Sequence, residues 1–155
     1  MAEVTVVIPN YNGIGYLKDC LDTLREQTYR DYEVLLVDNG SGDGSLAFAE
    51  EHYPWVKVLP LDRNYGFCGA VNAGIRAAQT PYVFLLNNDT KLHPDCIEEL
   101  MIMMHSHPNC FSCSARMIKM SEPDRLDDAG DYYCALGWAY ACLLYTSPSP
   151  RDTER

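Results

Sequence analysis

Short apolar runs alternate along this chain with segments whose apolar residues recur at helical spacing. The runs are continuous and not interrupted by polar residues, which is typical of strands covered on both faces. Such an alternation favours a parallel sheet with helices on both faces. The sequence therefore predicts an α/β fold built on a mostly parallel, doubly wound sheet. Strands are expected over 4–8, 33–37, 56–59 and 82–86, with a fifth over 111–118, and helices over 17–24, 45–52, 67–78 and 94–104.

Size and charge narrow the range of functions. The chain has 155 residues, of which 47% are hydrophobic and 22% charged, so one domain with a substantial core is expected. Its net charge of −10 is opposite in sign to that of proteins that bind duplex nucleic acid, so no nucleic-acid partner is expected. A bound anion would need backbone N–H groups or a metal ion to hold it.

The start of the chain and its apolar runs indicate where in the cell the protein is expected. The N-terminus lacks the basic region and cleavage site of a signal peptide, so a cytoplasmic location is expected. No apolar run approaches the roughly 18 residues that span a bilayer, so no transmembrane segment is expected. Attachment at the inner face of the membrane, to reach a lipid-linked partner, stays open.

Polar residues follow three of the expected strands, over 9–13, 38–41 and 87–90. The carboxyl ends of parallel strands meet at one edge of a sheet, where open α/β sheets bind ligands. Asp38 can accept hydrogen bonds from a nucleobase imide or a ribose hydroxyl, and Tyr11 can stack on a base. Asp89 is an oxygen ligand suited to Mg²⁺ or Mn²⁺, and such an ion could bridge it to a diphosphate.

The last 14 residues differ abruptly in composition from the rest of the chain. Residues 142–155 are rich in serine and proline, and 142–152 resemble the conceptual translation of a transposase-based sequencing adapter. They are therefore set aside as a non-native tail. The expected domain is 1–141, incomplete at its C-terminal end.

Several segments together resemble glycosyltransferase family 2. They are 6–12 (VVIPNYN), 17–29, 37–41 (VDNGS), 64–67 (NYGF), 72–74 (NAG) and 84–90 (FLLNNDT), and the resemblance extends over about 4–94. The chain is most similar to the rhamnosyltransferase-like members, which act in bacterial polysaccharide assembly. This resemblance implies the GT-A fold, in which a nucleotide-binding sheet joins an acceptor-binding half. It also implies inverting transfer of a sugar from a UDP- or dTDP-linked donor to a saccharide or lipid-linked acceptor.

The resemblance also implies roles for particular residues. Asn87–Asp89 occupies the family's DxD position, with Asn87 in place of the first acid, and Asp89 then binds the Mg²⁺ or Mn²⁺ on the donor diphosphate. No position up to Ala141 matches the family's catalytic base, so the fragment is expected to bind donor without transferring sugar. The residues implied in donor-nucleotide binding are Pro9, Asn10, Tyr11, Asn12, Asp38, Asn39, Asn64, Gly66, Asn87 and Asn88.

Two other functions fit parts of the pattern. An NAD-type dinucleotide-binding domain would also have an acid after its second strand, as Asp38 is, but it needs G-x-G-x-x-G after the first strand. Residues 9–13 lack that glycine spacing. A non-enzymatic nucleotide-binding module is the second alternative, because a fold does not by itself establish chemistry.

Overall fold

The computed structural model describes residues 2–122, 126–128, 131–133 and 139–141. The chain divides into two compact units, Met1–His105 and Ser106–Arg155, and each is described by itself. Within the described residues, no helix combines the length and the apolar character needed to cross a membrane.

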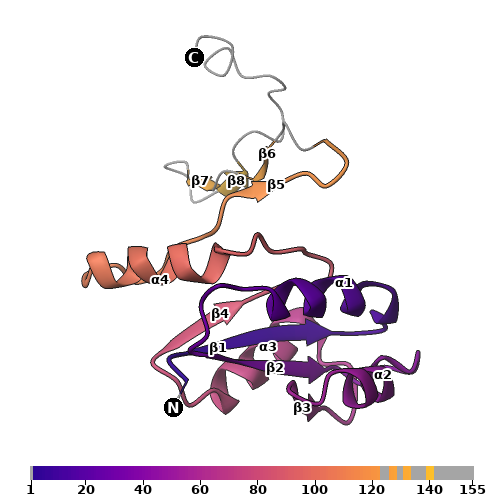
Figure 1. The fold of residues 1–155 in the computed structure, drawn as a ribbon. Coiled ribbons are helices and arrows are strands. Elements are labelled where there is room, and N and C mark those ends of the chain that lie inside the picture. Colours follow the sequence, from indigo (N-terminus) through magenta and orange to yellow (C-terminus); the bar gives the residue numbers. More distant parts are fainter. Residues whose placement is uncertain (1, 123–125, 129–130, 134–138, 142–155) are drawn as a thin grey trace. The chain divides into compact units, whose positions relative to one another are not determined.

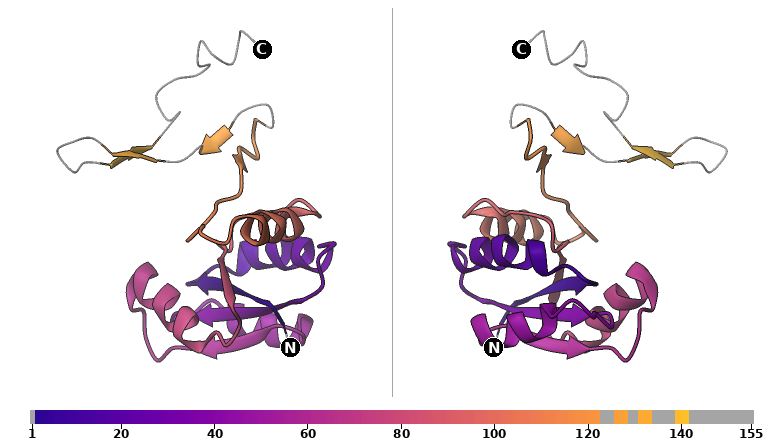
Figure 2. Two further views of the ribbon diagram at one scale, coloured as in Figure 1. Left: turned by 90° about the vertical axis from the view of Figure 1, so that its left-hand side faces the viewer. Right: turned by 90° about the vertical axis from the view of Figure 1, so that its right-hand side faces the viewer.

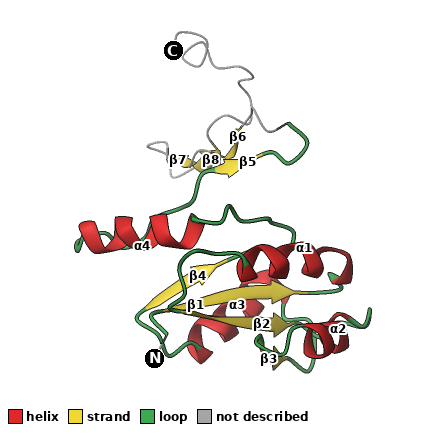
Figure 3. Cartoon of the chain, viewed as in Figure 1, coloured by secondary structure: helices red, strands yellow, loops and turns green. Residues whose placement is uncertain are grey.

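The first unit alternates strands and helices, as expected (Figures 1 and 3). Its strands form one parallel sheet in the order β3-β2-β1-β4, so the predicted α/β class and parallel sheet are confirmed. The elements are β1 (Val4–Asn10), α1 (Ile14–Arg25), β2 (Tyr32–Asp38), α2 (Ser45–His52), β3 (Lys57–Pro60), α3 (Gly66–Ala77), β4 (Tyr82–Leu85) and α4 (Cys96–Ser106).

Helices cover both faces of the two central strands, β1 and β2. On one face, alternate residues of β1 such as Ile8 pack in a core with Leu21 of α1 and Ile97 of α4. On the other face, Val7 packs with Ala70 of α3. Figure 2 shows α1 and α4 together on one side of the sheet. The alternation of side chains along β1 therefore divides the apolar residues between two cores.

β4 departs from the expectation that every strand is covered on both faces. Tyr82 and Phe84 pack against the core that contains α1, whereas Leu85 on the opposite face is 49% exposed. Leu85 is exposed because of the position of its strand. β4 is the last strand in the sheet order, and α3 packs over β1 and β2. An apolar run thus identifies a strand without showing whether a helix covers both of its faces.

The second unit corrects the expectation of a fifth strand over 111–118. Only β5 (Met117–Ile118) is a strand there, and it pairs antiparallel with β6 (Leu126–Asp128). Phe111 is almost fully exposed, so this stretch buries no apolar face that would hold it in a sheet. A second antiparallel pair joins β7 (Asp131–Tyr133) to β8 (Ala139–Ala141). The tail 142–155 lies outside the described residues.

The close approach of α3 to the sheet gives a first prediction. A β-carbon on Gly74 would lie 2.3 Å from Cγ1 of Val7 and 3.0 Å from Cγ2 of Val37. We expect Gly74→Ala to lower the free energy of unfolding by about 1–3 kcal/mol, because it overpacks this interface. Urea denaturation followed by circular dichroism measures the change.

Gly15→Ala is the matched control. Gly15 also lies in a helix, but no atom approaches within 4 Å of the place that a β-carbon would take there. We expect this variant to gain up to about 1 kcal/mol from helix propensity. If Gly74→Ala is stabilised as well, the tight packing of α3 on β1 and β2 is wrong.

Candidate functional site: a cleft at the carboxyl ends of the strands

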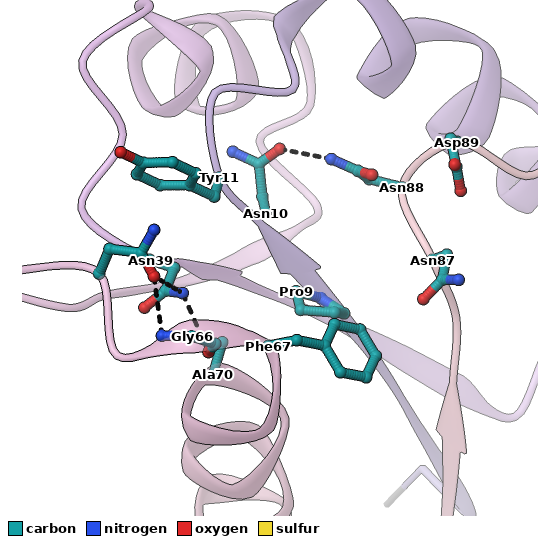
Figure 4. Close-up of a pocket in the computed structure, with 11 residues that line it drawn as sticks. Pro9, Asn10, Tyr11, Asn39, Gly66, Phe67, Ala70, Asn87, Asn88 and Asp89 are labelled. Atoms are coloured by element: carbon teal, nitrogen blue, oxygen red, sulfur yellow. Dashed lines mark hydrogen bonds between the residues drawn. The ribbon is translucent and has the colours of Figure 1, made fainter.

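The three polar strand ends meet at one edge of the sheet, as expected. Asn10 at the end of β1 is paired in register with Asp38 at the end of β2, and β4 runs parallel on the other side of β1. A cleft of about 340 Å³ opens at this edge (Figure 4). Its lining consists of Pro9, Asn10, Tyr11, Asn39, Asn64, Gly66, Phe67, Ala70, Asn87, Asn88 and Asp89.

Asn10 is the buried centre of the hydrogen bonds behind the cleft, and is only 1% exposed. Its Nδ2 lies 2.8 Å from Oγ of Ser45, 3.1 Å from Oδ1 of Asp38 and 3.2 Å from Oγ of Ser41. Its Oδ1 accepts a 2.8 Å bond from Nδ2 of Asn88. The loops after β1, β2 and β4 are thus joined through one carboxamide.

Asn12 and Asp43 fasten the loop after β1 to the loop after β2. Asn12 has a positive φ of 52°, a conformation that asparagine tolerates, and its Oδ1 accepts a 2.8 Å bond from the Gly42 amide. The two carboxylate oxygens of Asp43 accept bonds from the amides of Ile14 and Ser45, at the starts of α1 and α2. Burial opposes ionisation, but a hydrogen bond from the Ser45 side chain, together with these amide bonds, holds the pKa of the Asp43 carboxyl below its usual range.

The sequence alone did not single out Asp43. The available signal was an aspartate two residues before an expected helix, a position suited to capping. Its bond to Ser45 meets that local expectation, whereas its bond to Ile14 depends on how the two loops meet.

Asn39 holds the loop after β3 in the same manner. Its Nδ2 donates to Oδ1 of Asn64 at 2.9 Å and to the carbonyl of Gly66 at 3.2 Å. Its Oδ1 accepts a 2.9 Å bond from the amide of Tyr65. Gly66 has a φ of +76°, so the turn into α3 uses a conformation that favours glycine. Four strand-end loops are therefore fixed by asparagine side chains.

Other side chains of the cleft are much more open to solvent. Tyr11 and Phe67 are 51% and 62% exposed. The carboxylate of Asp89 is also exposed, and among the described residues it makes no hydrogen bond or ion pair. Tyr11 lies toward one end of the cleft and Asp89 toward the other (Figure 4). These side chains are placed to contact a ligand.

The structure gathers most of the residues singled out in the sequence, but not all of them, into the lining. Asn12 and Asp38 lie outside it. Asp38 is 2% exposed, and its Oδ2 accepts a 3.1 Å bond from the Ser41 amide. Phe67 is the first apolar residue of the helix expected over 67–78, and the structure places its ring in the cleft. Helical periodicity missed it because it lies in the first turn of α3, at the open edge of the sheet.

The chemistry of the cleft suits a divalent cation that brings other ligands with it. Among the described residues there is no group of three or more His, Cys, Asp or Glu that could enclose a metal. Mg²⁺ and similar ions are usually held by one or two carboxylates, with water and substrate phosphates completing the coordination. Asp89 fits that pattern, because its carboxylate makes no hydrogen bond or ion pair among the described residues.

The alternating parallel sheet with a cleft at the carboxyl ends of its strands is the arrangement expected of the nucleotide-binding part of a GT-A fold. A model of the family described as "Glycosyl transferase family 2" matches residues 5–141, so the chain belongs to glycosyltransferase family 2. Membership in this family rules out the NAD-type alternative.

Individual relatives agree with this assignment. The uncharacterized glycosyltransferase YibD of Escherichia coli is 34% identical over 104 residues, which are 65% of this chain and 30% of YibD. The chain spans a third or less of the length of the curated relatives it matches.

Solved structures share the fold. Staphylococcus aureus TarS 1–349 in complex with UDP has a TM-score of 0.64 at 22% identity, covering 77% of this chain and 40% of that one. The mannosyltransferase PcManGT from Pyrobaculum calidifontis, in complex with GDP-Man and Mn²⁺, has a TM-score of 0.59 at 25% identity. That match covers 66% of this chain and 32% of the mannosyltransferase.

The bonds of Asn39 give a second prediction. We expect Asn39→Ala to lower the free energy of unfolding by about 1–3 kcal/mol, because it removes the three hydrogen bonds that the buried Asn39 carboxamide makes to the loop after β3. Hydrogen exchange at the Tyr65 amide should also become faster, since that amide donates to Asn39. Urea denaturation and exchange measured by NMR check both effects.

Asn72→Ala serves as the control for this variant. Asn72 is exposed on α3, and its removal should change the free energy of unfolding by less than about 0.5 kcal/mol. Equal exchange rates at Tyr65 in Asn39→Ala and wild type would contradict the role given to Asn39.

Proposed function

We propose that this chain is the donor-binding part of a glycosyltransferase that takes a sugar from a nucleotide diphosphate. The observation that carries the proposal is the cleft, whose four loops are fixed by buried amides while Tyr11 and Asp89 stay exposed toward its two ends. A rigid polar cleft at the carboxyl edge of a parallel sheet suits a ligand with a flat base at one end and a charged group at the other.

Each part of the donor then has a proposed location. The nucleoside lies against Tyr11 and Asn39, with the loop of Pro9 to Asn12 and the carboxylate of Asp38 forming the wall behind it. Asn64 and Gly66 lie beside Asn39 at the nucleoside end, and the phosphates and sugar extend from there toward Asp89. UDP is bound in the TarS structure, which supports a UDP- or dTDP-linked donor.

A divalent cation at Asp89 accounts for anion binding by an acidic chain. The net charge of −10 opposes a diphosphate, and the described residues of the cleft lining include no lysine or arginine. Asp89 would hold Mg²⁺ or Mn²⁺, with Asn87 and Asn88 beside it. When bound, the ion would offset the charge that develops on the departing diphosphate. PcManGT was solved with GDP-Man and Mn²⁺, which supports this choice.

The rest of the reaction is part of the same proposal. By family resemblance the transfer inverts the anomeric centre, and the acceptor is a saccharide or a lipid-linked saccharide. A carboxylate outside 1–141 acts as the general base on the acceptor hydroxyl. This chain therefore binds donor without transferring its sugar. If it binds nucleotide diphosphates but the complete protein has no transfer activity, the non-enzymatic module becomes the better description.

Asp89→Ala tests the metal assignment. We expect wild type to bind UDP more tightly in Mn²⁺ than in EDTA, and the variant to lose at least tenfold in affinity in Mn²⁺, about 1.4 kcal/mol. In EDTA the two proteins should differ little, because without the ion Asp89 has no attractive contact with the diphosphate. Isothermal titration calorimetry measures both affinities.

Asp31→Ala is the matched control, since it removes the same charge from an exposed residue just before the start of β2, at the opposite edge of the sheet. It should bind UDP as wild type does in Mn²⁺. Equal losses in the two variants would show a general charge effect and contradict the metal role of Asp89.

A further inference from the structure

We propose that Asn10 is a positioning residue that fixes where Asp38 lies relative to Asn88. Through Asn88, it also fixes the position of the metal-binding end of the cleft. This inference rests on the proposed donor-binding function. Asn10 lies between the two ends of the cleft, and its carboxamide bonds to the loops on both sides (Figure 4). At 1% exposure with both ends of the amide bonded, it has no free polar atom for a ligand.

The first step in the argument is the carboxylate of Asp38. It is 2% exposed, and its two oxygens accept bonds from Nδ2 of Asn10 and from the amide of Ser41, each at 3.1 Å. A buried carboxylate oxygen without a donor is strongly disfavoured. The NH₂ group of Asn10 therefore fixes the orientation of Asp38.

The second step is the contact between Asn10 and Asn88. Nδ2 of Asn88 donates to Oδ1 of Asn10 at 2.8 Å, directly over Gly13. A β-carbon on Gly13 would lie 2.1 Å from Nδ2 of Asn88 and 2.5 Å from Oδ1 of Asn10. The space that a side chain would fill at residue 13 is thus occupied by this amide pair. Asn88 directly precedes Asp89, so fixing Asn88 limits where the Asp89 carboxylate can lie.

Only a carboxamide of this length meets both requirements. One end must donate its two N–H groups among the oxygens of Asp38, Ser41 and Ser45, and the other must accept from Asn88. Aspartate has the same shape but offers no donor when ionised. In Asn10→Asp, a carboxylate oxygen would face Oδ1 of Asp38 at the 3.1 Å now spanned by a hydrogen bond. Two carboxylates at that distance share a proton, so one of the pair has a raised pKa.

Asn10→Asp therefore makes the positioning depend on pH. At low pH the shared proton restores a hydrogen bond between residues 10 and 38, and it is lost as the pH rises through the raised pKa. The charged group that residue 10 touches is Asp38; the nearby Asp43 carboxylate is occupied by the Ile14 and Ser45 amides. Wild type has a carboxamide in place of the second carboxylate, so this source of pH dependence is absent.

The experiment follows two NMR signals and one affinity from pH 4.5 to 8.5. In ¹⁵N-labelled Asn10→Asp, the amide of Ser41 reports on Asp38, and the side-chain NH₂ of Asn88 reports on the other loop. We expect both to titrate with one common midpoint above the usual aspartate pKa. The affinity for UDP in Mn²⁺ should fall at least tenfold through the same midpoint, relative to wild type at each pH.

Two further variants keep the test decisive. Asn72→Asp adds the same charge on the exposed face of α3 and should leave both signals and the affinity as in wild type. Among the described residues, Asn88→Ala removes only the side-chain bond to Oδ1 of Asn10, so the tightening of UDP binding by Mn²⁺ should shrink while the Ser41 amide stays in place. Circular dichroism at each pH confirms that the variants are folded. If Asn10→Asp is unfolded at high pH, Asn88→Ala tests the contact between Asn10 and Asn88, and an unchanged tightening of UDP binding by Mn²⁺ in that variant contradicts its role.

The possible results separate this inference from the proposed function. If wild type binds UDP and Asn10→Asp binds it equally well at pH 8, or if Ser41 titrates while Asn88 does not, Asn10 does not link the two loops. If both signals share a midpoint but neither protein binds UDP, the donor-binding function fails and the linkage through Asn10 stands.

Discussion

The parallel pairing of β1 with both neighbours is the constraint on which the site depends. β1 is matched to β2 over its whole length, from Val4 opposite Tyr32 to Asn10 opposite Asp38, and to β4 on its other edge. Because all three strands run the same way, their carboxyl ends and the loops that follow lie at one edge. The two apolar cores hold β1 in the middle of the sheet, and the cleft is a consequence of that register.

Asparagine is the residue that converts this edge into a fixed site. A carboxamide both donates and accepts, so it can join two loops that each present only one kind of partner. Asn10, Asn12 and Asn39 each bond to a loop other than their own. They do so without adding charge to a chain whose net charge is already −10. Loops held in this manner are arranged before a ligand arrives, which lowers the entropic cost of binding.

Much of the fold followed from the sequence because its signals are local. Apolar periodicity located the elements of the first unit, and the polar strand ends predicted the edge where Asn10 and Asp38 meet. The exposure of Leu85 and Phe67 could not be predicted in this way, since it depends on which strand is last in the sheet and what packs beside it. The hydrogen-bond partners could not be predicted from the sequence either, because the bond from Ile14 to Asp43 forms only when two loops are in place.

The central claim is that the cleft at the strand ends binds the nucleotide diphosphate, and mapping UDP on the ¹⁵N-labelled chain in Mg²⁺ tests it most directly. We expect amide shifts to change around Tyr11, Asn39, Gly66 and Asp89. A second hollow of about 420 Å³ offers an internal comparison, lined by Leu61, Asp62, Tyr65, Gly69, Asn72, Ala73 and Arg76. Changes concentrated around Gly69 to Arg76, with Tyr11 and Asp89 unmoved, would contradict the account.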